Sequence, residues 1–198
     1  MSIRAVGLGL LTLLALASSL FAFTLPDSVV KNTSFQHATG KLLQHEAVIP
    51  TSVKEVWNAF TTTEGLRSFV APVVEIDFRV GGVWEASYDP THRIGDTTNI
   101  QNEVLSFVPE RLLSIRIKRT PPGFPNPEVA AKIATVIEFH PIDANNTKVI
   151  ISMCGWEAKP EFDKVYQLFA WGNGETLKNL YRRFVEGPLR WKGVEKKG

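Results

Sequence analysis

Cysteine is nearly absent from this chain of 198 residues, which contains a single one, Cys154. A lone cysteine cannot close an intramolecular disulfide, and it excludes cysteine-based zinc fingers, CxxC redox pairs and disulfide frameworks. The fold must therefore be stabilised by its apolar core. Cys154 falls at the end of an expected strand and is interpreted as a small buried hydrophobe.

An excess of one charge is missing as well. Lys and Arg number 22 against 20 Asp and Glu, so the formal net charge is +2. This balance lacks the basic surface that nucleic-acid phosphates select, and no nucleic-acid partner is expected. A content of 44% hydrophobic and 21% charged residues is typical of one ordinary folded domain.

Motifs that identify common enzymes are also lacking. The sequence contains no GxSxG, HExxH or Walker-type phosphate loop. His45 has the parity of the inner face of the first strand, where a satisfied core histidine is the common case. A metal site can be drawn from Asp89, His92 and Asp96, but their spacing matches no recognised ligand pattern, so a solvated loop is favoured. We expect no catalytic residue, metal ion or cofactor.

The first residues have the layout of a secretory signal peptide. Arg4 precedes an apolar run, and small residues follow it up to Ala22. This pattern predicts that residues 1–22 are a leader cleaved near Ser19 or Ala22 and that the mature protein is secreted or periplasmic, with no membrane span left. An uncleaved anchor is the alternative, since residues 5–23 carry no charge and are just long enough to cross a bilayer.

Beyond the leader the chain divides into a polar N-terminal arm (23–41), a folded domain (42–190) and a basic tail (191–198). Alternating apolar residues predict strands near 42–49, 74–80, 83–88, 99–108, 111–118, 132–139 and 148–154. Helical spacing predicts short helices near 53–61 and 64–70 and a long one from 160 to about 185. Because no helix separates the later strands, we predict an α+β fold in which the helices cover one face of an antiparallel sheet.

This order of elements is similar to the helix-grip fold of START-like proteins, in which a curved antiparallel sheet wraps around a long C-terminal helix. The local matches are residues 49–57 (IPTSVKEVW), 78–82 (FRVGG), 108–113 (VPERLL), 146–149 (NTKV), and Trp171-Gly172 followed by Leu177 and Leu180. Together, from about residue 43 to 186, they resemble the family of activator of heat-shock protein 90 ATPase homologues, also known as SRPBCC domains. The sequence pattern itself predicts a sheet of about six or seven strands, with two short helices after the first strand.

The resemblance also implies a cavity between the sheet and the last helix that holds a small apolar or amphipathic molecule. The inward parity of the strands and the inner face of the helix select the residues expected to line it: Phe78, Trp84, Tyr88, Ile115, Met153, Phe169, Asn173 and Thr176. Apolar side chains would supply affinity, and Tyr88, Asn173 and Thr176 would orient a polar end of the ligand. The loops at 89–98 and 119–130, the latter carrying Phe124, are expected to cover the cavity mouth.

Two other functions remain open. An enzyme of the cyclase, dehydratase or hydrolase type, using the same cavity, needs an inward-facing acid or base, and His45, Tyr88 and Glu85 are the candidates. A co-chaperone-like interaction module would show a filled core beside a large exposed apolar patch.

Two glycines in the long helix leave a further choice open. Gly172 and Gly174 each cost about 1 kcal/mol relative to alanine inside a helix, so each needs a compensating reason. Close packing of the helix on the sheet and an opening of space at the cavity wall explain them equally well.

Overall fold

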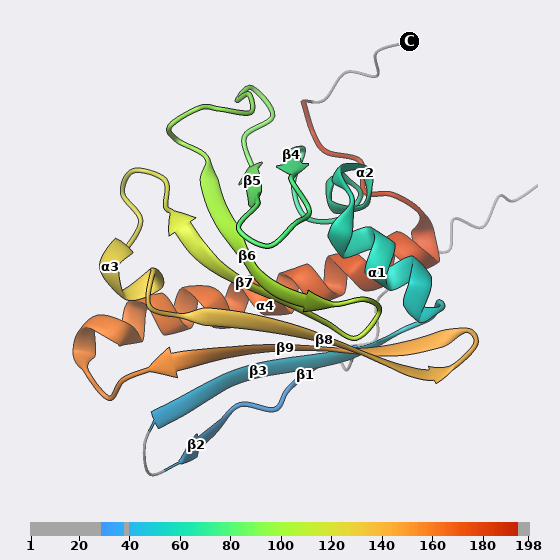
Figure 1. Ribbon diagram of the computed structural model, residues 1–198, viewed down its shortest axis with the longest axis horizontal. Coiled ribbons are helices and arrows are strands. Elements are labelled where there is room, and N and C mark those ends of the chain that lie inside the picture. Colours follow the sequence, from blue (N-terminus) through green and yellow to red (C-terminus); the bar gives the residue numbers. More distant parts are fainter. Residues whose placement is uncertain (1–28, 38–39, 194–198) are drawn as a thin grey trace, which may run out of the picture.

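The computed structural model describes residues 29–37 and 40–193 (Figure 1). The strands are β1 (Val30–Asn32), β2 (Phe35–His37), β3 (Gly40–Ile49), β4 (Val73–Ile76), β5 (Val83–Ser87), β6 (Ile100–Val108), β7 (Leu112–Arg119), β8 (Ala134–Asp143) and β9 (Asn146–Trp156). The helices are α1 (Val53–Thr61), α2 (Thr63–Arg67), α3 (Pro127–Ala130) and α4 (Pro160–Glu186). The predicted leader, residues 1–22, lies outside the described residues.

The strands form one antiparallel sheet that curves across α4 (Figure 1). Its order is β1-β3-β9-β8-β7-β6-β5-β4, with β2 also paired to β3. The register between β6 and β7 shifts at Gln101/Asn102 and at Val104/Ser106, and irregularities of this kind bend a sheet. The predicted α+β helix-grip fold is confirmed.

The polar arm contributes two strands that the sequence did not predict. β1 and β2 both pair with β3, with Val30 opposite Ala47 and Phe35 opposite Leu42. Each is three residues long, which is too short for a period-two pattern to be recognised. The sheet therefore has nine strands rather than six or seven.

The two short helices form where capping residues place them. Ser52 caps α1 by accepting a hydrogen bond from the backbone N–H of Glu55, and Thr62 caps α2 by accepting one from Gly65. Gly65 is required by close approach, because a Cβ there would collide with the carbonyl oxygen of Asn58 in α1. The two helices are thereby packed tightly together at one end of the sheet (Figure 1).

The long helix α4 ends one residue beyond its predicted limit, at Glu186. Gly187 follows with a φ of +94°, a backbone conformation that glycine adopts readily and that cannot continue the helix. None of the helices in the described part of the chain, α4 included, has the length and hydropathy needed to cross a membrane.

The core contains a gap opposite the middle of α4. The buried residues of this helix are Phe162 and Val165 near its start and Leu177 and Leu180 toward its end. The first pair packs in a cluster that includes Trp156, and the second packs in the main core with α1 and α2. Between Val165 and Leu177, over about three helical turns, no side chain of α4 is fully buried. This stretch positions the candidate site.

Candidate functional site

A chamber of about 150 Å³ lies between the sheet and the middle of α4, and we call it the inner chamber. Five strands, β5 to β9, each contribute two inward side chains to its floor, and α4 forms its roof. Its lining comprises Phe60, Val70, Trp84, Ala86, Tyr88, Ile100, Asn102, Ile115, Ile117, Thr135, Ile137, Ile151, Met153, Phe169, Gly172, Asn173 and Thr176. The lining is mostly aliphatic and aromatic, with a few polar groups, as in small-molecule sites.

A second hollow of about 320 Å³, the outer chamber, adjoins the first. The two share several lining residues, including Tyr88, Phe169 and Gly172. Phe124, from the Pro-rich loop, lines the outer chamber, and its ring lies 6.1 Å from that of Phe169. The structure thus places part of the 119–130 loop over the outer chamber, as the sequence predicted.

Seven of the eight residues predicted to line a cavity are brought together in the inner chamber: Trp84, Tyr88, Ile115, Met153, Phe169, Asn173 and Thr176. Phe78 is not among them. β4 ends at Ile76, four residues before its predicted limit, so strand parity no longer applies at position 78. The Phe78 ring instead packs against Phe107 at 4.6 Å and Trp57 at 5.7 Å, within the core beside α1.

The floor of the chamber was largely missed by the sequence prediction. Trp84, Asn102 and Ile117 are successive partners across β5, β6 and β7. Ile115, Thr135 and Met153 are successive partners across β7, β8 and β9. Three of these six were predicted, and the others follow from them once the register between strands is known. Parity within a strand identifies its inward residues, but only the register shows which strands place them side by side.

The space around the two helix glycines favours one of the two explanations. A Cβ built on Gly172 or on Gly174 would meet nothing within 4 Å, so neither glycine is explained by close packing on the sheet. Gly172 lines both chambers, whereas Gly174 lines neither. The absence of a side chain at Gly172 therefore enlarges the site.

Two residues that line the inner chamber each carry a buried donor without a protein partner. Within the described residues, Trp84 Nε1 and Asn173 Nδ2 make no hydrogen bond. The Thr176 hydroxyl, in contrast, donates to the Gly172 carbonyl oxygen at 2.9 Å. Tyr88 is 70% exposed and lies on the rim. Of the three predicted polar anchors, Asn173 thus has a buried donor without a partner. Trp84, which was expected to contribute only apolar surface, has a second such donor.

Glu85, a candidate acid or base, points away from the chamber. It alternates with the lining residues Trp84 and Ala86 along β5, so it faces the opposite side of the sheet. Its Oε1 accepts hydrogen bonds from the Gly95 backbone N–H at 2.7 Å and the Asn99 amide at 2.6 Å. Glu85 therefore anchors the loop that follows β5.

The charge of Glu85 is stabilised by this network. Burial acts to raise the pKa of Glu85, but hydrogen bonds from Asn99, Gln101 and the Gly95 backbone outweigh it. Together with the positive charge of Arg119, they hold the pKa below its ordinary value. A carboxylate kept ionised by structural bonds is suited to holding a loop in place.

His45 is buried on the inner face of β3, as its parity predicted, and is 6% exposed. Its Nδ1 has no hydrogen-bond partner among the described residues. Burial lowers the pKa of His45, because the charged imidazolium loses its hydration. His45 does not line either chamber.

The carboxylates of Asp89 and Asp96, near His92, accept hydrogen bonds from the backbone of their own loop. Asp89 accepts from the backbone N–H of Thr91 at 2.9 Å, and Asp96 accepts from the backbone N–H of Arg93 at 2.7 Å. The His92 ring is hydrogen-bonded through Nδ1 to the Ser87 hydroxyl at 2.8 Å. No grouping of three or more metal-ligating side chains occurs in the part of the chain that the structure describes.

Cys154 corrects an expectation. It lies on β9 directly after the inward-facing Met153, so its side chain points outward and is exposed. The interpretation of Cys154 as a buried hydrophobe is wrong, because its position on β9 places its side chain on the face of the strand opposite Met153.

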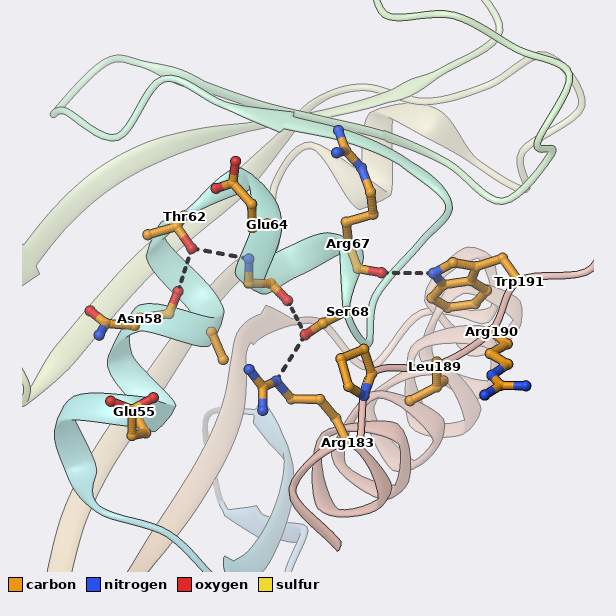
Figure 2. Close-up of a pocket in the computed structure, with 13 residues that line it drawn as sticks. Glu55, Asn58, Thr62, Glu64, Arg67, Ser68, Arg183, Leu189, Arg190 and Trp191 are labelled. Carbon is orange, nitrogen blue, oxygen red and sulfur yellow. Dashed lines mark hydrogen bonds between the residues drawn. The ribbon is translucent and has the colours of Figure 1, made fainter. Parts of the chain in front are cut away.

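A larger hollow of about 630 Å³ lies between the two short helices and the segment after α4 (Figure 2), and we call it the seam. Polar groups across it bond to one another. Arg183 Nε donates to Ser68 Oγ at 2.9 Å, and the Trp191 indole donates to the Arg67 carbonyl oxygen at 2.7 Å (Figure 2). The first bond ties α4 to the end of α2, and the second anchors the C-terminal segment. Trp191 also lines the outer chamber. The polar groups of the seam thus hold α4 and the C-terminal segment against α2. The candidate site is the pair of chambers between the sheet and α4.

A nine-stranded antiparallel sheet that grips a long C-terminal helix, with a chamber between them, defines a protein of the helix-grip, START-like class. The chain belongs to the Activator of Hsp90 ATPase homolog 1-like protein family, whose model matches residues 50–184. The family expected from the sequence is therefore confirmed. Comparison with curated proteins finds no match.

Solved structures share the fold at low sequence identity. The Aha1 dimer from Colwellia psychrerythraea superposes with a TM-score of 0.55 at 16% identity, covering 74% of this chain and 97% of that one. CalU16 from Micromonospora echinospora gives 0.56 at 14% identity, covering 81% and 86%. Norcoclaurine synthase from Thalictrum flavum, in complex with dopamine and hydroxybenzaldehyde, gives 0.53 at 13% identity, covering 80% and 91%. At such identities the likeness shows the fold.

Proposed function

We propose that this protein binds a small apolar or amphipathic molecule in the two chambers between the sheet and α4. The observation that carries the proposal is the gap in the core. Protein interiors are normally packed to crystal-like density, yet here α4 crosses the inward side chains of five strands without filling the space beneath it. Gly172 enlarges that space at a cost of about 1 kcal/mol to the helix.

The entrance supports the same function. Tyr88 and Trp171 are 70% and 68% exposed and both line the outer chamber, where Phe124 joins them. Exposed aromatic side chains around a hollow are typical of ligand sites. Norcoclaurine synthase, which shares the fold, is in complex with two small aromatic molecules, and this supports a ligand-binding use of the fold.

The enzyme alternative finds less support in the geometry. It needs an acid or base inside the chamber, but Glu85 faces the other side of the sheet and His45 lies outside the lining. Among the described lining residues, Tyr88 and Glu175 are the titratable ones: Tyr88, exposed on the rim, lines both chambers, and Glu175 lines the outer one. An interaction module was expected to have a filled core, whereas this core contains a chamber.

A fluorescent probe tests the proposal. N-phenyl-1-naphthylamine is uncharged and apolar, and its emission rises when it leaves water. We expect it to bind the wild-type protein and not the Phe169→Arg variant, because a charged side chain in an apolar site is strongly unfavourable for the ligand. Gln167→Arg introduces the same charge on the exposed side of the same helix and should bind the probe normally. Equal binding by both variants would contradict the proposal.

Export is part of the proposed function. The charge, apolar run and small residues of positions 1–22 support a cleaved leader and a secreted or periplasmic protein. N-terminal sequencing of the protein recovered from its host should give a chain that starts near residue 20 or 23. Recovery of an intact N-terminus in the membrane fraction would favour an uncleaved anchor instead.

A further inference from the structure

The inner chamber offers a ligand hydrogen-bond donors. Trp84 is 6% exposed, lines the chamber, and its Nε1–H has no partner among the described residues. An indole nitrogen can only donate, so its partner must be an acceptor. Asn173, which also lines this chamber, has a buried side-chain nitrogen without a partner among the described residues. A molecule that enters without an acceptor leaves these donors unpaired, which is costly in a buried site.

The charge of the lining restricts the kind of acceptor. Of the described residues that line the two chambers, Glu175 is the one with a formal charge, and Lys178 pairs with it at 2.9 Å. The chambers thus offer no cation to a carboxylate or phosphate group. Moving an unpaired anion from water into such a site is strongly unfavourable. The acceptor is therefore an uncharged group, of which a carbonyl oxygen is the common example.

The volume limits what can stand next to these donors. The inner chamber holds about 150 Å³, and an apolar cavity of about this size accepts one benzene ring. The remainder of a larger ligand would occupy the outer chamber of about 320 Å³, between Phe124 and Trp171.

Resting on the ligand-binding function above, we propose that the ligand is an uncharged molecule whose inner end is a single ring, or a group of similar size, bearing a carbonyl oxygen. Ketones, aldehydes and quinones have this chemistry. Trp84 Nε1–H donates to the carbonyl oxygen, and the Asn173 amide supplies a second donor. The outer end of the ligand is apolar and lies against the aromatic side chains of the outer chamber.

Three probes of matched size test this inference. Acetophenone carries a carbonyl, α-methylstyrene replaces that oxygen with a carbon, and benzoate carries a negative charge. Each is titrated into the ¹⁵N-labelled protein, and Kd is measured by NMR from the signals of lining residues. We expect acetophenone to bind about tenfold more tightly than α-methylstyrene, and benzoate not to bind. The Trp84 indole proton should move downfield with acetophenone alone.

Variants identify the side chain that donates a hydrogen bond to the carbonyl oxygen of acetophenone. Trp84→Phe should weaken acetophenone to the affinity of α-methylstyrene and leave the hydrocarbon unaffected. Asn173→Leu keeps a similar shape without the amide and should reduce the same preference. Gln167→Leu, on the exposed side of α4, should change nothing. If Trp84→Phe fails to fold, the indole shift in the wild type and the Asn173→Leu variant still decide the question.

The possible outcomes separate this inference from the function it rests on. Equal affinity for acetophenone and α-methylstyrene overturns the role of the donors but leaves ligand binding intact. Tighter binding of benzoate overturns the requirement for a neutral ligand. If no probe, including N-phenyl-1-naphthylamine, shifts a signal from the lining, both this inference and the proposed function are wrong.

Discussion

Replacing the two glycines of α4 separates their roles. Gly172 and Gly174 lie two residues apart in α4, and a Cβ on either would meet nothing within 4 Å. Only Gly172 lines the chambers. We therefore expect alanine to be tolerated at both positions, with a consequence for ligand binding at position 172 alone.

The magnitude follows from helix propensity. Alanine is favoured over glycine in a helix interior by about 0.8–1.0 kcal/mol, and the open space adds no steric cost. Each variant should gain about 1 kcal/mol in the free energy of unfolding, which raises Tm by about 2–4 °C for a chain of this size. Gly172→Leu adds four carbon atoms to a chamber of about 150 Å³ and should block the probe.

The assay combines urea unfolding with the titration of N-phenyl-1-naphthylamine. The expected order of probe affinity is wild type and Gly174→Ala together, then Gly172→Ala, with Gly172→Leu lowest. If Gly172→Ala were destabilising while Gly174→Ala was not, Gly172 would have to pack against the sheet. That result would refute the assignment of open space at this position.

Three further predictions concern single side chains. Because burial lowers the pKa of His45, the unfolded chain takes up a proton near pH 6.5 that the folded protein does not, so stability should fall as pH drops below 6.5. His45→Leu should reduce that slope, by at most about 1.4 kcal/mol per pH unit, in urea titrations at pH 5 to 7. Glu85→Gln should lose about 1–3 kcal/mol at pH 7. In the wild type the pKa of Glu85 is lowered, so this stabilisation should be lost only as pH falls below 4.5 and through the pKa of the folded state. In the variant, amide hydrogen exchange in residues 88–99 should be faster. The exposed thiol of Cys154 should react with a maleimide in the native state without changing Tm, whereas slow reaction limited by unfolding would contradict its outward orientation.

The spacing of apolar residues within single elements was sufficient to predict most of the strands and helices. The alternation through β7 placed Ile115 inward, and the spacing in α4 placed Phe169, Asn173 and Thr176 on one face. Both patterns are set by the backbone geometry of a single element, which a sequence displays directly. Where an element ended earlier than its pattern suggested, as at Ile76, the prediction for Phe78 was wrong.

Features that depend on distant segments could not be read from the sequence. β1 and β2 exist because β3 offers them an edge, and nothing in three residues signals that pairing. The floor of the chamber depends on the register between strands, which is why Asn102 and Ile137 were missed. Whether Gly172 packs closely on the sheet or opens space could be decided only once the position of α4 over the sheet was known.

The most direct test of ligand binding between the sheet and α4 is a crystal structure of the protein grown with N-phenyl-1-naphthylamine. We expect the probe to lie in the chambers, in contact with Phe169 and with the floor near Trp84 and Met153. A probe seated only in the seam, beside Arg183 and Trp191, or an inner chamber closed by its own side chains, would contradict the account.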